Sequence, residues 1–221
     1  PDKGPYPAVM EYSGYDPSSP STGQPQYKAM LPPSGYAWIG VNIRGTGCSG
    51  GAFNFFENLQ ESWEFSWPKP RVIVMSFPHN PTTTCVDLDF MQKVVDFARE
   101  RDVVIVHDNA YAELGFDGYR PPSILQAEGA KEVAVELYSM TKSFSMAGWR
   151  VAFMVGNPEI VAALAKLKSY LDYGTFQPVQ IAATVTLNEA PDYPLEANAI
   201  YQARRDALCD GLNRIGWELE P

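Results

Sequence analysis

The chain has 221 residues, of which 45% are hydrophobic and 13% aromatic, enough to bury a core in one domain or two small ones. A formal net charge of -9, with no run of lysine or arginine, argues against a nucleic-acid partner. No apolar run approaches the roughly 18 residues of a membrane span and the first residues do not resemble a signal peptide, so we expect a cytoplasmic protein without membrane association. The three cysteines, odd in number and far apart, favour a reducing compartment.

The first quarter of the chain is dense in proline, glycine, serine and tyrosine. Within it we predict two short strands, over residues 6–12 and 36–43, separated by a polar segment. The second strand is followed by Arg-Gly-Thr-Gly-Cys-Ser-Gly-Gly at residues 44–51. This phrase resembles the amino-terminal part of α/β-hydrolases of the cocaine-esterase and X-Pro dipeptidyl-peptidase type. The resemblance implies that Tyr15 helps to form an oxyanion hole.

Ser49 lies at the centre of a G-x-S-x-G pattern, the letter pattern of a nucleophile elbow. An elbow needs a strand, a sharp turn and a helix, together with a downstream acid and histidine. The residues after Ser49 carry no helix pattern, so we do not expect it to be a nucleophile. A serine hydrolase, or a non-catalytic fusion fragment, remains an alternative to the function that the rest of the chain indicates.

From residue 71 onward, strand and helix patterns alternate, which predicts a three-layer α/β domain. Residues 103–107 are nearly all apolar and are expected to be buried on both faces of a parallel sheet. Residues 132–138 alternate charged and apolar side chains, as a half-buried strand would. The other predicted strands cover residues 71–77 and 149–155, and the predicted helices cover residues 88–99, 158–167, 178–187 and 195–215.

Polar residues follow three of these strands directly. Asn80 follows the first, Asp108 and Tyr111 follow the second, and Lys142 follows the third. The carboxyl ends of parallel strands meet at one edge of a sheet, which is where open α/β sheets bind ligands. We therefore expect these four side chains to share one site.

Three runs carry a resemblance to a known family. They are Ser-Phe-Pro-His-Asn-Pro-Thr-Thr at 76–83, His-Asp-Asn-Ala-Tyr at 107–111, and Ser-Met-Thr-Lys-Ser-Phe-Ser-Met-Ala-Gly-Trp-Arg at 139–150. Together they resemble fold-type-I pyridoxal-phosphate enzymes of the class I/II aminotransferases. Phrases such as Trp-Pro-Lys-Pro at 67–70 and Lys-Ser-Tyr-Leu-Asp-Tyr-Gly-Thr-Phe at 168–176 look most like the alanine and diaminopimelate branch. The resemblance implies an incomplete three-layer large domain of a pyridoxal-phosphate-dependent transferase over residues 57–221. A hydrolase-like fragment over residues 1–56 precedes it, so the chain is expected to be a hybrid.

The resemblance also implies the activity. The chain is expected to move an amino group from an amino acid, with an alanine-like donor favoured, to a 2-oxo acid. Lys142 is expected to hold pyridoxal 5'-phosphate as a Schiff base and then to act as general base at the substrate α-carbon. Asp108 is expected to keep the ring nitrogen of the cofactor protonated. The complete family enzyme is expected to be a homodimer.

Four further residues complete the implied cofactor site. Asn80 and Tyr111 match the positions that hydrogen-bond the phenolic oxygen, and Ser139 and Arg150 match the phosphate contacts. The family often has glycine where this chain has Thr83, and we interpret this as tolerable variation.

Each of these residues also has a purely structural interpretation. A lysine in a polar loop is usually a surface charge, an aspartate at a strand end can cap a helix, and an asparagine before a proline suits a turn. His79 and His107 lack metal-ligand spacing, and we expect each to pack or hydrogen-bond beside the cofactor. No metal site is expected.

The family's ring-stacking aromatic and first sheet strands precede residue 57 in family members, and the arginine that binds the substrate carboxylate follows residue 221. We therefore expect little turnover from this chain. We also expect aggregation through an unpaired edge of the strand at residues 71–77, with the strands at residues 6–12 and 36–43 as the alternative cover for that edge.

Overall fold

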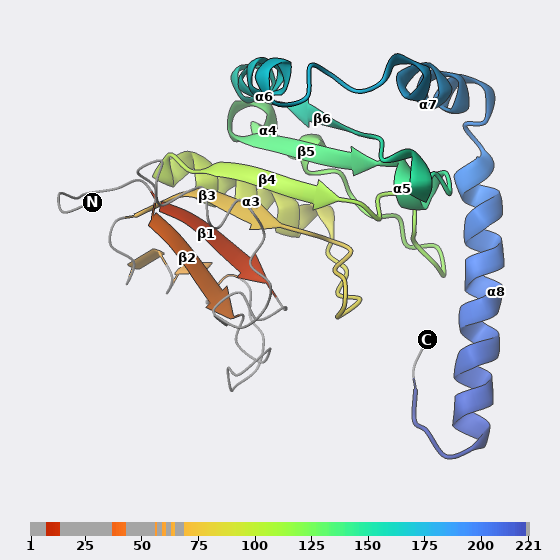
Figure 1. Cartoon of the computed structure of the whole chain (residues 1–221). Coiled ribbons are helices and arrows are strands. Elements are labelled where there is room, and N and C mark those ends of the chain that lie inside the picture. Colours follow the sequence, from red (N-terminus) through yellow and green to blue (C-terminus); the bar gives the residue numbers. More distant parts are fainter. Residues whose placement is uncertain are drawn as a thin grey trace.

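The structure of the protein is a computed structural model, which describes residues 8–13, 37–42, 56, 59–60, 63–64 and 69–219, the first two segments as backbone only. These residues form a single open sheet with strand order β2-β1-β3-β4-β5-β6 (Figure 1). The strands are β1 (Ala8–Ser13), β2 (Ala37–Asn42), β3 (Pro70–Met75), β4 (Val104–Asn109), β5 (Ala134–Ser139) and β6 (Ala152–Gly156).

The strands β2, β1, β3, β4 and β5 pair in parallel, and β6 pairs antiparallel with β5. Because β1 lies beside β3, the expectation that residues 71–77 would leave an unpaired edge is wrong. The pairing between these two strands is irregular at one point: Ala8 faces Pro70, and Val9 already faces Val72. Proline lacks a backbone N–H, so the first position of a strand is one of the few that it occupies without loss of a sheet hydrogen bond.

The predicted helices are present, with boundaries that differ by at most two residues for those at 88–99, 178–187 and 195–215. In addition, short helical turns follow or precede several strands. The helices are α3 (Leu88–Arg101), α4 (Ala130–Val133), α5 (Met140–Ser143), α6 (Pro158–Leu171), α7 (Gln177–Glu189) and α8 (Tyr193–Arg214), with 3-10 turns η2 (Ile124–Gln126) and η3 (Ala147–Trp149).

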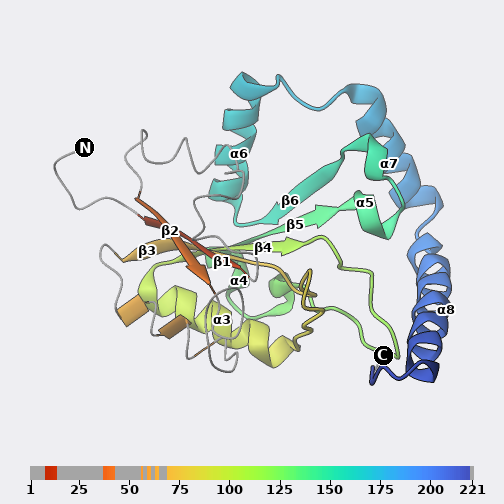
Figure 2. The ribbon, with the colours of Figure 1, turned by 60° about the horizontal axis from the view of Figure 1, so that its bottom comes forward.

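The helix α3 covers one side of the sheet, and α6 lies on the other side (Figure 2). The carboxylate of Asp87 caps α3 by accepting a hydrogen bond of 2.8 Å from the backbone N–H of Phe90, and Asp102 ends it in the left-handed conformation. The apolar stripe of the helix is fully buried and forms the main core with β3 and β4. Its members are Met91, Val94, Val95 and Ala98.

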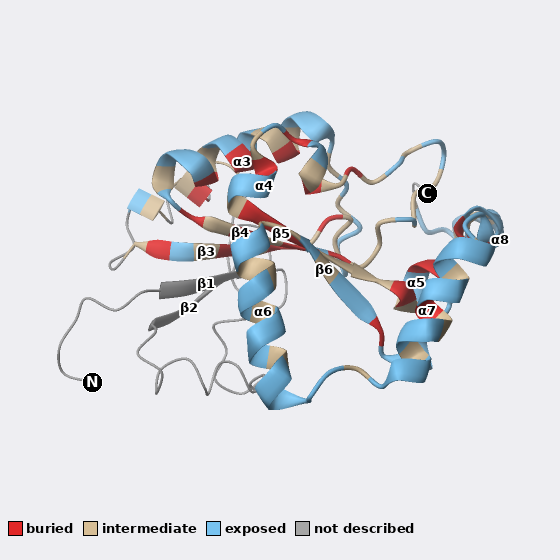
Figure 3. Cartoon of the chain, turned by 90° about the horizontal axis from the view of Figure 1, so that it is seen from above, coloured by how far each residue is buried: buried red, intermediate tan, exposed pale blue. Residues whose placement is uncertain are grey.

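Two expectations about burial need correction. In β4, Ile105 and His107 are buried, but Val104 and Val106 on the opposite face are only half-buried, so the strand is not covered equally on both faces. In β5 the alternation of charged and apolar residues does not predict the exposed face, because Glu136 is only 5% exposed. Figure 3 shows that α6, α7 and α8 expose most of their surface, in contrast to α3.

The strand β6 begins three residues later than expected, because residues 147–149 form the turn η3 instead. It ends at Gly156, whose φ of +133° lies outside the range that other residues favour. A Cβ atom at this position would lie 2.4 Å from the carbonyl oxygen of Ala134. A glycine is therefore required where β6 closes against the start of β5. Among the helices that the structure describes, none has the length and apolar character needed to cross a membrane.

Candidate functional site

The candidate site lies at the carboxyl ends of β3, β4 and β5. These strands are parallel neighbours, so the loops that follow them leave the sheet at one common edge. Asn80 lies in the loop after β3, Tyr111 in the turn after β4, and Lys142 in the short helix α5 directly after β5. The predicted placement of these residues at a common edge is confirmed.

Three of the predicted side chains converge around Tyr111. The side-chain amide of Asn80 donates a hydrogen bond of 2.9 Å to the Tyr111 hydroxyl. The Lys142 Nζ atom lies 5.9 Å from the centre of the Tyr111 ring. Asn80 and Lys142 are exposed, so the amine and the amide are both accessible to a ligand that enters at this edge.

Asp108 is the fourth predicted residue at this edge and precedes the last residue of β4. Partial burial of its carboxyl raises its pKa above the ordinary value. The charge of His107 and a hydrogen bond from the backbone of Ala110 act in the opposite direction and lower this pKa. A cationic group bound beside Asp108 would compensate for the cost of burying its charge.

Ser139 and Arg150 are held by local backbone contacts. The Ser139 hydroxyl caps α5 by accepting a hydrogen bond of 3.2 Å from the backbone N–H of Thr141. The Arg150 guanidinium donates a hydrogen bond of 3.1 Å to the carbonyl oxygen of Ala147. Among the hydrogen bonds and ion pairs of the described residues, none joins either side chain to Lys142. The sequence does not reveal these local partners.

The helix that carries Lys142 is anchored by a small apolar cluster. Met140 and Phe144 of this segment pack with Met146, Val151 and Ala183, the last of which belongs to α7. The cluster fixes the turn after β5 because apolar side chains on both sides of the lysine are buried while its amine is not.

The sequence did not predict a contribution from α8, which forms one wall of a cavity of about 870 Å³ beside Asn80 and Tyr111. The other walls are the loops after β3 and β4. The cavity also holds Tyr119, whose hydroxyl donates a hydrogen bond of 2.8 Å to the Val86 carbonyl and whose pKa burial raises to about 12. The sequence predicts a helix over residues 195–215 but does not show which loop α8 faces.

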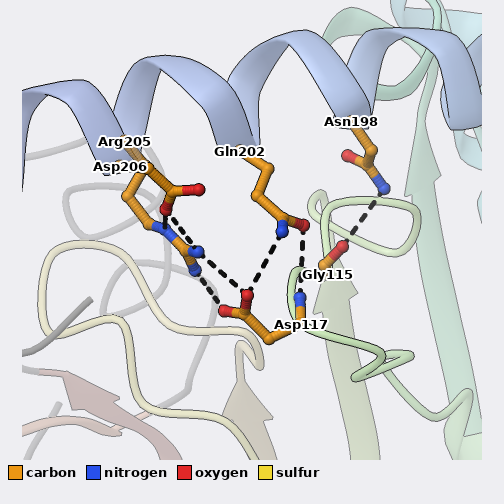
Figure 4. Close-up of polar contacts among 6 residues, drawn as sticks. All are labelled: Gly115, Asp117, Asn198, Gln202, Arg205 and Asp206. Atoms are coloured by element: carbon orange, nitrogen blue, oxygen red, sulfur yellow. Dashed lines mark hydrogen bonds and ion pairs between the residues drawn. The ribbon is translucent and has the colours of Figure 1, made fainter.

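The contact between α8 and the loop after β4 is polar (Figure 4). Arg205 binds both carboxylate oxygens of Asp117, and Gln202 adds a hydrogen bond of 3.2 Å to the same carboxylate. Asn198 donates to the carbonyl oxygen of Gly115 at 3.4 Å. We call Asn198, Gln202 and Arg205 the α8 clamp. The clamp fixes the loop that begins at Tyr111.

The two histidines occupy different environments. His79 lies in the loop beside Asn80 and has its Nδ1 atom 2.8 Å from the Thr82 hydroxyl. His107 is fully buried on β4, on the opposite face of the strand from Asp108. In the part of the chain that the structure describes, no group of three or more histidine, cysteine or acidic side chains is arranged to hold a metal ion.

Comparison with known proteins connects this site to a family. Residues 33–221 match the family of class I and II aminotransferases, which is most of the chain. The chain belongs to this family. Residues 1–64 also match the X-Pro dipeptidyl-peptidase family (S15), so the expectation of a hybrid chain is confirmed. The two matched regions overlap over residues 33–64.

Two curated aminotransferases illustrate the similarity. Over 167 residues the chain is 47% identical to the glutamate-pyruvate aminotransferase AlaC of Escherichia coli K12, an overlap of 76% of this chain and 40% of that protein. Over 152 residues it is 43% identical to the LL-diaminopimelate aminotransferase of Moorella thermoacetica, an overlap of 69% of this chain and 39% of the relative. The chain thus spans well under half the length of either relative.

Solved aminotransferase structures share the fold. Substrate-bound BacF from Bacillus subtilis superimposes with a TM-score of 0.76 at 30% identity, covering 98% of this chain and 51% of that one. The N-succinyldiaminopimelate aminotransferase of Mycobacterium tuberculosis gives a TM-score of 0.78 at 23% identity, covering 98% of this chain and 53% of that one. The fold is an incomplete α/β large domain of a pyridoxal-phosphate-dependent transferase, as expected, and the aminotransferase family depends on that cofactor.

Proposed function

We propose that residues 57–221 form the cofactor-binding part of an aminotransferase that moves an amino group between an amino acid and a 2-oxo acid. The observation that carries the proposal is the convergence of Asn80, Tyr111 and Lys142 at the carboxyl edge of three parallel strands. An amine, a phenol and an amide at one sheet edge suit an aldehyde cofactor that also carries a phenolic oxygen. Residues 1–56 are the hydrolase-like fragment in this proposal.

The donor set fits pyridoxal phosphate. Lys142 supplies the amine for a covalent bond, Asp108 supplies a carboxylate for the ring nitrogen, and Asn80 with Tyr111 supplies hydrogen bonds for the phenolic oxygen. The carboxyl of Asp108 has its pKa raised by burial, so a protonated ring nitrogen beside it would stabilise its charge. Ser139 and Arg150 supply a hydroxyl and a guanidinium for the phosphate.

Each residue then has a defined task in the transfer. Bound pyridoxal phosphate supplies an electron sink that stabilises negative charge at the substrate α-carbon. Lys142, once free, takes the proton from that carbon as general base and returns it during the transfer. Asp108 holds the proton on the ring nitrogen, and Tyr111 with Asn80 fixes the orientation of the ring.

An alanine-like amino donor is the favoured substrate. The support is the 47% identity to a protein named glutamate-pyruvate aminotransferase, because pyruvate is the 2-oxo acid that corresponds to alanine. The relatives named LL-diaminopimelate aminotransferase favour a longer, dibasic donor instead. Comparing alanine with diaminopimelate as donor to the cofactor-loaded chain decides between these two substrates.

The decisive experiment is covalent trapping. The purified chain is loaded with pyridoxal phosphate, reduced with borohydride, digested and mapped by mass spectrometry. We expect the phosphopyridoxyl label on Lys142, and we expect Lys142→Arg to lose it while Lys166→Arg keeps it. Lys166 is a suitable control because it is an exposed lysine on α6. Label on other lysines with none on Lys142 would contradict the proposal.

A serine hydrolase is the second candidate, favoured only by the match of residues 1–64 to the X-Pro dipeptidyl-peptidase family. Ser49 and Tyr15, the residues that this candidate depends on, lie outside the described part of the chain. A fluorophosphonate probe tests it directly. Labelling of Ser49 would support the hydrolase, and an unlabelled chain that traps pyridoxal phosphate on Lys142 would support the aminotransferase.

A further inference from the structure

A buried pair of ionisable side chains lies under the candidate site. His107 on β4 is 0% exposed and Glu136 on the neighbouring β5 is 5% exposed. The His107 Nδ1 atom lies 3.2 Å from a Glu136 carboxylate oxygen, Oε2. The other ring nitrogen, Nε2, lies 3.2 Å from the backbone carbonyl oxygen of Phe77, just beyond β3. The ring therefore connects all three strands that carry the site.

The hydrogen bonds around Glu136 are those of a carboxylate anion. The same Oε2 atom accepts a bond of 2.8 Å from the Ser123 hydroxyl and one of 3.0 Å from the backbone N–H of Ile124. Burial alone would raise the pKa of Glu136, but hydrogen bonds from His107, Ser123 and Asn109 together with the charge of His107 outweigh burial and lower it. An ionised carboxylate only accepts hydrogen bonds, so Glu136 needs a donor on His107.

The Phe77 carbonyl also needs a donor on His107, because a backbone carbonyl oxygen cannot donate. A neutral imidazole has one N–H and would leave a nitrogen lone pair facing one of the two oxygens. An imidazolium has an N–H on both nitrogens and satisfies both oxygens. We propose that His107 is a buried imidazolium ion, held by Glu136 and the Phe77 carbonyl, and that it keeps Asp108 ionised.

Asp108 follows His107 directly in β4 and points from the opposite face of the strand. Burial raises the pKa of the Asp108 carboxyl and the charge of His107 lowers it, so the histidine counteracts the effect of burial. The groups that face His107 are Glu136 from β5 and the Phe77 carbonyl from the end of β3. Because an ionised Asp108 is what the ring nitrogen of the cofactor needs, His107 is a positioning residue for the proposed function, and its role in transfer rests on that function.

The chain offers a direct measurement of the charge on His107, because it contains only two histidines. Nitrogen NMR of the ¹⁵N-histidine-labelled chain without cofactor resolves both rings, and His79→Asn assigns them. At pH 7 we expect both His107 nitrogens to have the shifts of protonated nitrogens. His79 is the internal control, because burial lowers its pKa and its ring should be neutral at this pH. A neutral His107 ring at pH 7 would overturn the proposal.

The effect on Asp108 is measured by NMR titration of ¹³C-labelled aspartate carboxyls. The Asp108 signal is assigned as the one that disappears in Asp108→Asn. An opposite charge close to a carboxylate lowers its pKa by about 1–3 units, and the two side chains here lie on opposite faces of a strand. We therefore expect His107→Gln to raise the Asp108 titration midpoint by about one unit, or tenfold in proton affinity. His79→Gln should leave it unchanged, and an unchanged midpoint in His107→Gln would also overturn the proposal.

Glu136→Gln is a second variant in which the charge on His107 should be lost. It removes the anion that stabilises the imidazolium, so His107 should become a neutral ring. If both variants fail to fold, the spectrum of the unaltered chain still decides the charge of His107. None of these measurements uses the cofactor. An unlabelled Lys142 would therefore count against the proposed function alone, whereas a neutral His107 would count against this inference alone.

Discussion

Thr83 occupies a backbone conformation that favours glycine, with a φ of +57°. Its hydroxyl donates a hydrogen bond of 2.7 Å to the Thr82 carbonyl, but it is exposed, and a β-branched residue in this region is strained. We expect Thr83→Gly to raise the free energy of unfolding by about 0.5–1 kcal/mol, measured by urea titration. The neighbouring Thr84→Gly should instead lower it by about 0.5–1 kcal/mol, because glycine adds unfolded-state entropy there and the 2.7 Å hydrogen bond between the Thr84 and Thr82 hydroxyls is lost. Equal effects of the two changes would contradict this explanation.

Asp108 is predicted to oppose folding at neutral pH. Burial raises the pKa of Asp108 in the folded state, so folding favours the protonated carboxyl. The stability that the protonated form contributes is fully present below the ordinary pKa of 3.8, and it is lost as the pH rises through the folded-state pKa. We expect Asp108→Asn to raise the stability of the cofactor-free chain at pH 7. Below pH 3.8 we expect the variant and the unaltered chain to be equally stable. Thermal unfolding over this pH range is the measurement.

Asp117 is the matched control for Asp108. A hydrogen bond from Arg205 lowers the pKa of Asp117, so its stabilising contribution is present above the ordinary value and lost as the pH falls through the folded pKa. Asp117→Asn should therefore lower stability at pH 7, the opposite sign to Asp108→Asn. The same sign for both variants would show that the charge environments of the two sites have been misassigned.

The residues of the candidate site were predictable to the extent that they depend on strand ends. Asn80 and Tyr111 follow apolar runs, Lys142 follows a run of alternating charged and apolar residues, and strands in alternation with helices place their carboxyl ends on one sheet edge. The partner of His107 was not predictable in this way. Glu136 occupies a charged position in an alternating pattern, which predicts exposure. Only its contact with His107 on the neighbouring strand β4 explains why it is buried.

At the scale of elements, the junction of β5 and β6 depends on Gly156. An added Cβ would lie 2.4 Å from the Ala134 carbonyl oxygen in a backbone conformation with φ of +133°. We expect Gly156→Ala to lower the free energy of unfolding by about 2–3 kcal/mol. The backbone of β5 would have to move away from the added Cβ, and alanine is strained at this φ. Gly148→Ala is the control, because no atom lies within 4 Å of the added Cβ. A comparable loss in both variants would contradict the steric explanation.

The α8 clamp is expected to control the order of the loop after Tyr111. Arg205→Lys keeps the positive charge but loses the planar two-point contact with Asp117. We expect several-fold faster amide hydrogen exchange in residues 113–118, with little change in α3. Arg214→Lys, near the end of the same helix, is the control and should leave the exchange rates unchanged. Unchanged exchange in Arg205→Lys would show that the loop is ordered without the clamp.

Element positions were well predicted because local chemistry sets them. Asn157 caps α6 and Pro158 begins it, and both residue types mark a helix start in the sequence alone. The start of β6 was predicted three residues early because the apolar Trp149 was counted with the strand, whereas it is the last residue of the turn η3. The pairing of β1 with β3 was not predictable, because strand order depends on contacts between distant segments.

The whole molecule exposes many large apolar side chains on α6, α7, α8 and their connections. Tyr173 is 92% exposed and Phe176 is 73% exposed. Such surfaces bind hydrophobic dyes and promote association between copies of a chain. Because the β3 edge is paired, we expect any aggregation of this chain to arise from these helices instead.

This source of aggregation can be tested with surface substitutions. We expect the double change Tyr173→Glu and Phe176→Glu to lower the fluorescence of the dye ANS and the light scattering of the purified chain by at least half. Ser169→Glu with Asn188→Glu adds the same charge at exposed polar positions and is the control. If the control lowers both signals equally, charge alone and not the loss of apolar surface explains the effect.

The contact between β1 and β3 joins two segments that match different families. β1 lies in the region that matches a peptidase family, whereas β3 lies in the region that matches aminotransferases. A parallel ladder requires only backbone amides and carbonyls on an open side of a sheet, and these groups are the same in every lineage. The irregularity at Ala8 and Val9 shows the ladder adjusting around Pro70. A strand whose sequence matches one family can thus extend a sheet whose sequence matches another, so the boundary between family matches need not be the boundary of the folded unit.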